Sequence, residues 1–134
     1  MRAEFWYICT VDPDPPEIEI LQQDGFLEVR FLGPFSVERF GKQVEQAVQA
    51  CKDRNLTLLL LDYTPLTGIP TTLDRYQISV HGADAARNLH KLAGYATPEQ
   101  MGEKFGALVA RNRGLNVDVF TDRDEAIRWL LEPR

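Results

Sequence analysis

The sequence contains few of the residues on which hydrolytic and metal chemistry depend. It has two histidines, His81 and His90, and two serines, Ser36 and Ser79, neither of which stands in a Gly-x-Ser-x-Gly motif. No Gly-x-Gly-x-x-Gly motif follows a strand pattern, which argues against a loop that cradles phosphate groups. We therefore expect no metal site and no bound cofactor, and we do not expect an enzyme.

Cysteine is also scarce. Cys9 and Cys51 lie far apart in the sequence and fit neither a Cys-x-x-Cys motif nor the spacing of metal ligands. A chain of 134 residues, 44% of them hydrophobic, can bury roughly two thirds of its unfolded surface without a disulfide. We interpret both cysteines as reduced, buried side chains of a cytoplasmic protein.

A basic surface and a long apolar run are missing as well. The formal net charge is -5 and the pI is about 5.0, so there is no excess of Lys and Arg to bind nucleic acid or an anionic membrane surface. Glu4 interrupts the only early apolar run, and no run approaches the ~20 residues of a membrane span. No repeat or linker divides the chain, so we expect one domain over residues 1–134 and no membrane span.

The first part of the chain predicts antiparallel strands. Residues 17–23 and 26–31 are strand patterns joined by Asp24-Gly25, a dipeptide that tolerates the positive φ angles of a tight hairpin turn. Residues 4–11 form an aromatic and β-branched strand pattern that has no evident partner in the core. We expect this segment to cover a sheet edge or an apolar surface, and a homodimer is one way to do so.

From Ser36 onward, helical and strand patterns alternate. The expected elements are a helix capped by Ser36, a strand over 56–62, a helix over 72–88, a strand over 91–96, a helix from 97 to a cap at Gly114, a strand over 115–120 and a helix over 121–131. This order predicts an α/β domain. Its mixed sheet begins with the antiparallel hairpin, continues with parallel strands and is covered by about four helices.

The helical periodicity also predicts which residues are buried. For the helix after Ser36 they are Val37, Phe40, Val44, Ala47, Val48 and Cys51. For the helix over 72–88 they are Leu73, Tyr76, Val80, Ala83 and Ala86, with Asp74, Gln77, His81, Asp84 and Asn88 outside. For the helix from 97 they are Met101, Phe105, Leu108 and Val109.

The loop after the 56–62 strand is the candidate site, because ligands and partners of open α/β sheets bind beyond the carboxyl ends of parallel strands. The candidate residues are Asp62, Tyr63, Thr67, Gly68, Thr71 and Thr72. Asp62 could act as a general base, or it could accept hydrogen bonds from the loop that follows. We favour the second interpretation, since no catalytic partner is evident in the sequence.

Several of these features together resemble a known family. They are the hairpin, the Leu-Leu-Leu-Leu-Asp62 strand, the loop ending at Thr71-Thr72, and the run Arg-Gly-Leu-Asn-Val-Asp-Val-Phe-Thr-Asp-Arg-Asp-Glu-Ala-Ile-Arg-Trp-Leu-Leu at 113–131. The chain resembles a STAS domain, and more closely the stand-alone bacterial branch described as SpoIIAA-like or STAS/SEC14-like. The resemblance covers nearly everything after residue 17. It implies a small mixed sheet covered by helices.

In the anti-sigma-factor antagonists of this family, a strand-end Asp is followed by Asp-Ser-Ser-Gly, whose first Ser accepts a phosphate. On this chain the strand-end residue is Asp62, and the four motif positions fall on Pro70, Thr71, Thr72 and Leu73. The resemblance thus makes Thr71 a candidate phospho-acceptor without the flanking Asp and Gly. We prefer to interpret Thr71 or Thr72 as the N-cap of the following helix.

Three functions are therefore considered. The first is a non-catalytic regulatory or protein-interaction module of STAS type, which acts through loop 63–72 and the following helix on a protein partner. The second, which the SEC14-like side of the resemblance implies, is a carrier or sensor of a small apolar or nucleotide ligand in the crevice beside Asp62. The third and least favoured is an enzyme with Asp62 as general base.

Overall fold

The computed structural model describes residues 7–9, 17–102 and 104–133. Within this part of the chain lie six strands and five helices. The strands are β1 (Tyr7–Cys9), β2 (Ile18–Gln22), β3 (Leu27–Phe31), β4 (Leu58–Asp62), β5 (Lys91–Tyr95) and β6 (Val117–Phe120). The helices are α1 (Val37–Asp53), α2 (Thr72–Ala85), α3 (Pro98–Met101), α4 (Phe105–Asn112) and α5 (Arg123–Leu131).

All the described strands form one mixed sheet, in the order β1-β2-β3-β4-β5-β6. β1 and β2 are antiparallel, as are β2 and β3, and strands β3 to β6 are parallel. The β2–β3 hairpin pairs Ile18 with Phe31 and turns at Gly25, whose φ is +84°. The predicted α/β fold, with an antiparallel hairpin leading into parallel strands, is confirmed.

β1 forms one edge of the sheet, where its residues Tyr7 to Cys9 pair with Ile20 to Ile18 of β2. The described part of the predicted 4–11 strand therefore covers a sheet edge within its own chain. Residues 4–6, 10 and 11 of that prediction lie outside the described residues. A homodimer stays a prediction.

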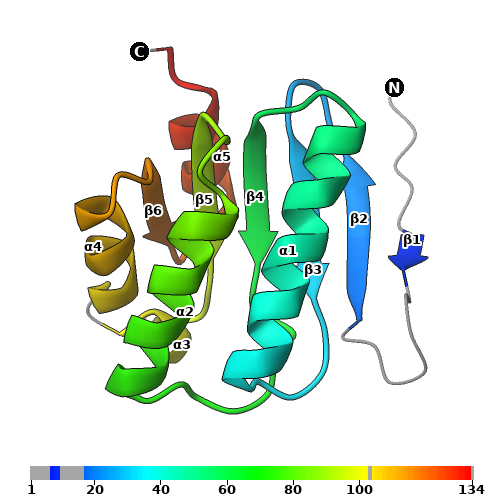
Figure 1. Ribbon diagram of the computed structural model, residues 1–134. Coiled ribbons are helices and arrows are strands. Elements are labelled where there is room, and N and C mark those ends of the chain that lie inside the picture. The colour runs from blue at the N-terminus through cyan, green and yellow to red at the C-terminus, as the bar shows by residue number, and fades with distance from the viewer. Residues whose placement is uncertain (1–6, 10–16, 103, 134) are drawn as a thin grey trace.

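The helices form two layers (Figure 1). Because the parallel strands follow one another in both chain and space, right-handed crossovers place the connecting helices α1, α2 and α4 on one face of the sheet. Helix α5 packs on the opposite face against β4, β5 and β6. Successive side chains of β4 point to opposite faces of the sheet. Leu59 and Leu61 therefore lie in the core under α1, and Leu60 lies in the core under α5.

Helix α1 buries the face that its periodicity predicts. Ser36 caps it, with its hydroxyl oxygen accepting a hydrogen bond of 3.1 Å from the Arg39 N–H. Four of the six predicted inner residues are buried, while Val37 and Val48 are half-buried. The buried four are Phe40, Val44, Ala47 and Cys51.

Gln43 on α1 was not predicted to be buried. Its side-chain amide nitrogen Nε2 donates hydrogen bonds to the carbonyl oxygens of Glu17 at 2.9 Å and Leu32 at 3.1 Å. These two residues flank the hairpin strands, so the bonds fix α1 to that end of the hairpin. A buried amide is stable here because its donor groups are paired.

Helix α2 buries only part of the face that the sequence predicts. Leu73 is 65% exposed and Tyr76 is 40% exposed, although both were expected inside. Of the predicted inner residues, Ala83 and Ala86 are buried and Val80 is half-buried. The inner face also includes Arg75, Ile78, Ser79 and Gly82.

The close approach of α2 and α4 gives a physical reason for this orientation. A Cβ atom on Gly106 of α4 would lie 2.8 Å from the Ser79 hydroxyl oxygen. Small residues are therefore needed where the two helices meet, and large ones such as Leu73 and Tyr76 are accommodated outside. The helix thus turns its small side chains inward.

The helix predicted to run from residue 97 is divided into α3 and α4. The Thr97–Gln100 capping box at its start is confirmed. Gly102 and Lys104 both have positive φ angles, 57° and 62°, which breaks the helix between them. Leu108, expected inside, is 53% exposed, and the side chain of Phe105 lies outside the described part. None of the helices in the described part is both long and apolar enough to cross a membrane.

Candidate functional site

Asp62 ends β4 and is 4% exposed. Its Oδ1 atom accepts hydrogen bonds from the Thr64 N–H at 2.9 Å and from the Thr64 hydroxyl at 2.6 Å. Its Oδ2 atom lies 3.4 Å from Arg30 Nε. Asp62 therefore accepts hydrogen bonds from its own loop, as the favoured interpretation of the sequence states, and both carboxylate oxygens are engaged.

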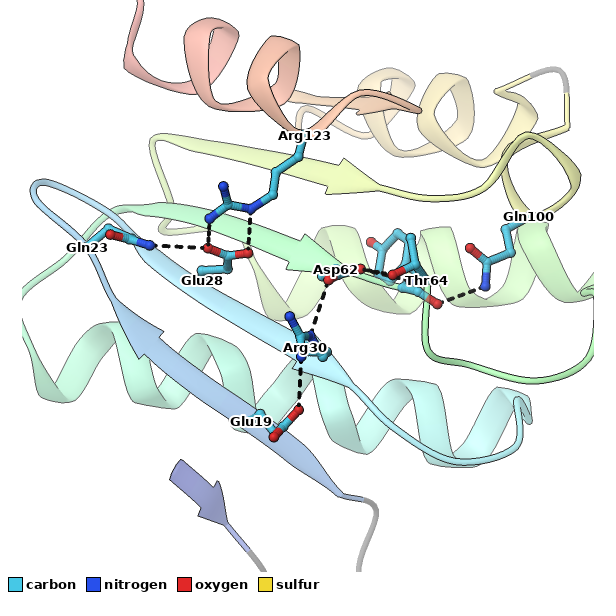
Figure 2. A network of polar contacts seen from close by, with 9 residues as sticks. Glu19, Gln23, Glu28, Arg30, Asp62, Thr64, Gln100 and Arg123 are labelled. Atoms are coloured by element: carbon cyan, nitrogen blue, oxygen red, sulfur yellow. Dashed lines mark hydrogen bonds and ion pairs between the residues drawn. The ribbon is translucent and has the colours of Figure 1, made fainter. Parts of the chain in front are cut away.

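The Asp62 carboxylate belongs to a polar network on the face of the sheet that carries α5. Figure 2 shows Arg30 between Asp62 on β4 and Glu19 on β2, with 3.5 Å from Arg30 to the Glu19 carboxylate. In the same figure Arg123, at the start of α5, makes a bidentate ion pair with Glu28 of β3. Paired, hydrogen-bonded charges of this kind fix neighbouring elements in position.

Gln100 ties the start of the loop to the N-terminus of α3. Its Nε2 atom donates hydrogen bonds to the carbonyl oxygens of Tyr63 at 2.8 Å and Leu66 at 3.3 Å. Its Oε1 atom accepts a hydrogen bond of 2.8 Å from the Thr97 N–H. The capping-box glutamine that the sequence identified therefore has a second role, which only the fold reveals.

A second tie fixes the other side of the loop. The carbonyl oxygen of Thr67 accepts a hydrogen bond of 2.8 Å from the Phe35 N–H, and the Thr67 N–H donates one of 3.1 Å to the carbonyl oxygen of Gly33. Gly68 follows with a φ of +89°, a conformation that glycine adopts without strain. Residues 63–67 are therefore held on both sides.

Thr71 is the N-cap of α2 and forms a complete capping box with Asp74. Its hydroxyl oxygen accepts a hydrogen bond of 3.0 Å from the Asp74 N–H, and Asp74 Oδ2 accepts one of 2.9 Å from the Thr71 N–H. Thr72 is the first residue of the helix, and both threonines are exposed. The preferred interpretation of Thr71 as a helix cap is confirmed.

Three large apolar side chains are exposed around this helix start. Leu73 and Tyr76 lie one turn apart on the same face of α2, and Ile69, in the loop just before the cap, is 57% exposed. We call Ile69, Leu73 and Tyr76 the outer apolar set. The sequence prediction was wrong for two of them, Leu73 and Tyr76, which were expected to be buried. The sequence does contain a signal for the observed orientation of α2. A second set of residues also recurs at helical spacing and forms an alternative inner face: Arg75, Ile78, Ser79, Gly82 and Ala83.

Beneath α2 lies a cavity of about 130 Å³. It is bounded by side chains from α1, α2, α4 and the sheet, which include Val44, Ile78, Leu92, Ala107 and Val117. Asp62 does not line it, because alternation along β4 points Asp62 to the opposite face of the sheet. This cavity thus does not lie in the crevice beside Asp62.

Tyr63 connects the loop to this cavity. Its ring packs on Phe31 and Phe40 with centroid distances of 5.7 Å and 5.2 Å, and it passes over Gly94 of β5. Burial raises the pKa of the Tyr63 hydroxyl above its usual range, so the phenol stays neutral. Of the predicted site residues, Asp62 and Tyr63 therefore point inward, and Thr67, Gly68, Thr71 and Thr72 are exposed.

The described residues offer no evident metal site. Within residues 7–9, 17–102 and 104–133, no three His, Cys, Asp or Glu side chains are grouped as metal ligands would be. Burial strongly raises the pKa of the Tyr63 hydroxyl and of the Cys51 thiol on α1.

The hairpin, the parallel strands in chain order, and the helices on both faces together form the SpoIIAA-like fold of STAS domains. One similar solved structure is an uncharacterized protein of the DUF3478 family with a SpoIIAA-like fold, from Shewanella loihica PV-4. It is 17% identical, with a TM-score of 0.53, and the match covers 97% of this chain and 98% of that one.

Another similar structure is an anti-sigma factor antagonist from Mycobacterium paratuberculosis. It is 14% identical, with a TM-score of 0.59, and the match covers 90% of this chain and 98% of that one. No protein-family profile matches the chain, and no curated protein is significantly similar to it in sequence. The structural likeness confirms the fold that the sequence resemblance implied.

Proposed function

We propose that this protein is a non-catalytic regulatory module of STAS type that binds a protein partner through loop 63–72 and helix α2. The observation that carries the proposal is the outer apolar set of Ile69, Leu73 and Tyr76. Exposed apolar side chains that cluster on a surface mark interaction sites, whereas singly scattered ones are normal. Tyrosine is also among the residues that contribute most to binding at protein interfaces.

The fixed geometry of the loop supports the same proposal. Gln100 and Thr67 hold residues 63–67, and the capping box of Thr71 and Asp74 fixes the start of α2. A surface that is already ordered loses little conformational entropy when a partner binds. The similar structure of an anti-sigma factor antagonist supports a regulatory role among proteins of this fold.

Thr71 is proposed to act as a helix cap and not as a phosphorylation switch. Its hydroxyl already takes part in the capping box, and Pro70 and Leu73 replace the residues that accompany the acceptor in the switching relatives. A Thr71→Glu protein is therefore expected to keep its partner, with a stability change below ~2 kcal/mol. Loss of the partner in Thr71→Glu alone, or a phosphate found on Thr71 in the host, would restore the switch.

The proposed surface can be tested with a pair of matched variants. Leu73→Asp places a charge within the outer apolar set, and Leu131→Asp places the same charge on α5 at the opposite face, where Leu131 is 48% exposed. Tagged proteins would be recovered from the host and their partners quantified by mass spectrometry. We expect Leu73→Asp to reduce the recovery of a partner by about tenfold or more, and Leu131→Asp to leave it unchanged.

Thermal unfolding of both variants is the control. Since both positions are exposed, the two variants should melt like the parent protein. Partner recovery that falls equally in the two variants would contradict the proposed surface. So would an undiminished recovery in Leu73→Asp.

A further inference from the structure

The cavity beneath α2 combines apolar walls with positive charge. Most of its lining is aliphatic or aromatic, and the charged side chains at its wall are two cations, Arg75 of α2 and Lys104 at the start of α4. No described carboxylate lines it. The Lys104 amine is already paired with Asp118 at 3.2 Å. An occupant of this cavity would therefore be apolar over most of its surface and would meet positive charge at one place.

Arg75 has one donor group that lacks a partner. Its terminal nitrogen NH2 donates hydrogen bonds to the carbonyl oxygens of Glu99 at 3.2 Å and Gln100 at 3.1 Å. Its Nε–H is buried and has no hydrogen-bond partner within the described structure, and no described carboxylate pairs with its guanidinium. An unpaired buried donor on a charged group is costly. Because Arg75 lines the cavity and has no described carboxylate beside it, an anion bound in the cavity would supply the missing opposite charge.

Two hydroxyl groups line the same cavity. Ser79 lies one helical turn after Arg75 on α2, and Tyr63 enters from the loop. In the described part of the chain, neither side chain makes a hydrogen bond. Burial keeps the Tyr63 phenol protonated, so it remains a donor. The cavity therefore holds a charged donor and two hydroxyl donors, and its lining includes no acidic group.

The size of the cavity limits the ligand. A volume of about 130 Å³ is close to the ~150 Å³ of an engineered apolar cavity that binds benzene. We propose that this cavity binds a small monocarboxylic acid, whose apolar body is about one aromatic ring in size and whose carboxylate pairs with Arg75. This site is separate from the outer apolar set and from Asp62, and the proposal does not depend on the protein-binding function.

Arg75 suits a carboxylate because the guanidinium forms short, charge-assisted hydrogen bonds to planar anions. The apolar walls exclude strongly hydrated anions such as inorganic phosphate, which would lose their water without enough donors to replace it. A neutral apolar ligand would fill the same volume but leave the Arg75 guanidinium without an opposite charge. Comparing the affinities of an acid and its neutral analogue therefore tests whether the positive charge of Arg75 contributes to binding.

The probe is benzoate, titrated into the full chain at neutral pH by isothermal calorimetry, with benzyl alcohol as the neutral analogue. Two variants report on the cavity. Gly82→Leu fills it, because Gly82 lines it and a Cβ atom there meets nothing within 4 Å. Gln77→Leu adds the same side chain on the exposed side of α2 and is the matched control.

We expect benzoate to bind more tightly than benzyl alcohol, Gly82→Leu to abolish the binding of both, and Gln77→Leu to change neither. Arg75→Met should weaken benzoate by about tenfold or more and leave benzyl alcohol unchanged, because only the charge-assisted bond is lost. Thermal unfolding without ligand confirms that each variant is folded. If Arg75→Met fails to fold, Arg75→Lys keeps the charge but removes the Nε donor, and it should weaken benzoate alone.

Three results would overturn the proposal. The first is an absence of benzoate binding at millimolar concentration. The second is equal affinity for benzoate and benzyl alcohol, which would indicate a purely apolar cavity. The third is benzoate affinity that survives Gly82→Leu, because the acid would then bind elsewhere on the protein.

Discussion

Helices α1 and α2 occupy equivalent places in the fold and bury opposite kinds of residue. Each follows a strand of the sheet, and both lie on the same face (Figure 1). Helix α1 buries Phe40 and Val44, whereas α2 buries Ala83 and exposes Leu73 and Tyr76. The first helix supplies core volume. The second has a cavity beneath it and exposed apolar side chains above it.

The difference lies in what each helix packs against. Helix α1 meets the aromatic residues of the sheet, and its Phe40 ring lies 5.2 Å from Phe31 and 5.2 Å from Tyr63. Helix α2 meets α4 at Gly106, where even one added methyl group would come within 2.8 Å of Ser79. Because α2 turns small side chains inward, they do not fill the volume between the helix and the sheet, and the cavity remains there.

The largest expected effect comes from truncating one large apolar residue on each helix. Phe40→Ala should lower the free energy of unfolding by about 3–5 kcal/mol, because it removes a buried aromatic side chain from three ring contacts. Leu73→Ala should change it by less than about 0.5 kcal/mol, because Leu73 is mostly exposed. Urea denaturation measures both, and equal costs would remove the distinction between the helices.

A second difference concerns the pH dependence that α1 introduces. Burial raises the pKa of the Cys51 thiol to about 12, an effect that nearby Arg54 only partly offsets. Above pH 9 the unfolded chain releases this proton while the folded chain keeps it. Stability should therefore fall by about 1.4 kcal/mol per pH unit between that pH and the folded pKa.

The comparison of the parent protein with Cys51→Ala isolates this contribution, since other titrating groups are common to both. The difference in unfolding free energy between the two proteins should shrink as the pH rises above 9. A difference that stays constant from pH 8 to pH 11 would contradict the burial of this thiol. In a Cys9→Ser background, Cys51 should also react with a thiol reagent only after unfolding.

The smallest expected effect comes from one glycine in each helix. Gly82→Ala in α2 should stabilise the protein by about 0.5–1 kcal/mol, because alanine favours the helix and the new methyl group meets open space. Gly41→Ala in α1 should gain less, since its Cβ atom would lie 3.2 Å from the ring of His81. A larger gain at Gly41 than at Gly82 would show that α2 is packed more tightly than described.

The sequence predicts the structure well where local residue preferences and the burial of apolar side chains favour the same arrangement. The Asp24-Gly25 turn, the Ser36 cap, the Thr97–Gln100 capping box and the inner face of α1 are of this kind. Each depends on the residues of one hairpin or one helix. The pattern of a single segment is then sufficient.

The sequence-based prediction fails where packing between helices determines which residues are buried. Apolar residues occur on two faces of α2, and the contact between Ser79 and Gly106 selects the face with the smaller side chains. The division of α3 from α4 likewise depends on the backbone at Gly102 and Lys104. The ion pair of buried Glu28 with partly exposed Arg123 joins residues 95 positions apart, which no local pattern indicates.

Covalent capture of a partner at the outer face of α2 is the most direct test of the central claim. Leu73 would be replaced by the photo-crosslinker p-benzoylphenylalanine, and Leu131 on the opposite face of the sheet would be replaced in the same way as the control. Irradiation of host cells that produce each protein should give a discrete protein adduct at position 73 and none at position 131. An adduct formed equally at both positions, or none at position 73, would contradict the assignment of this surface to partner binding.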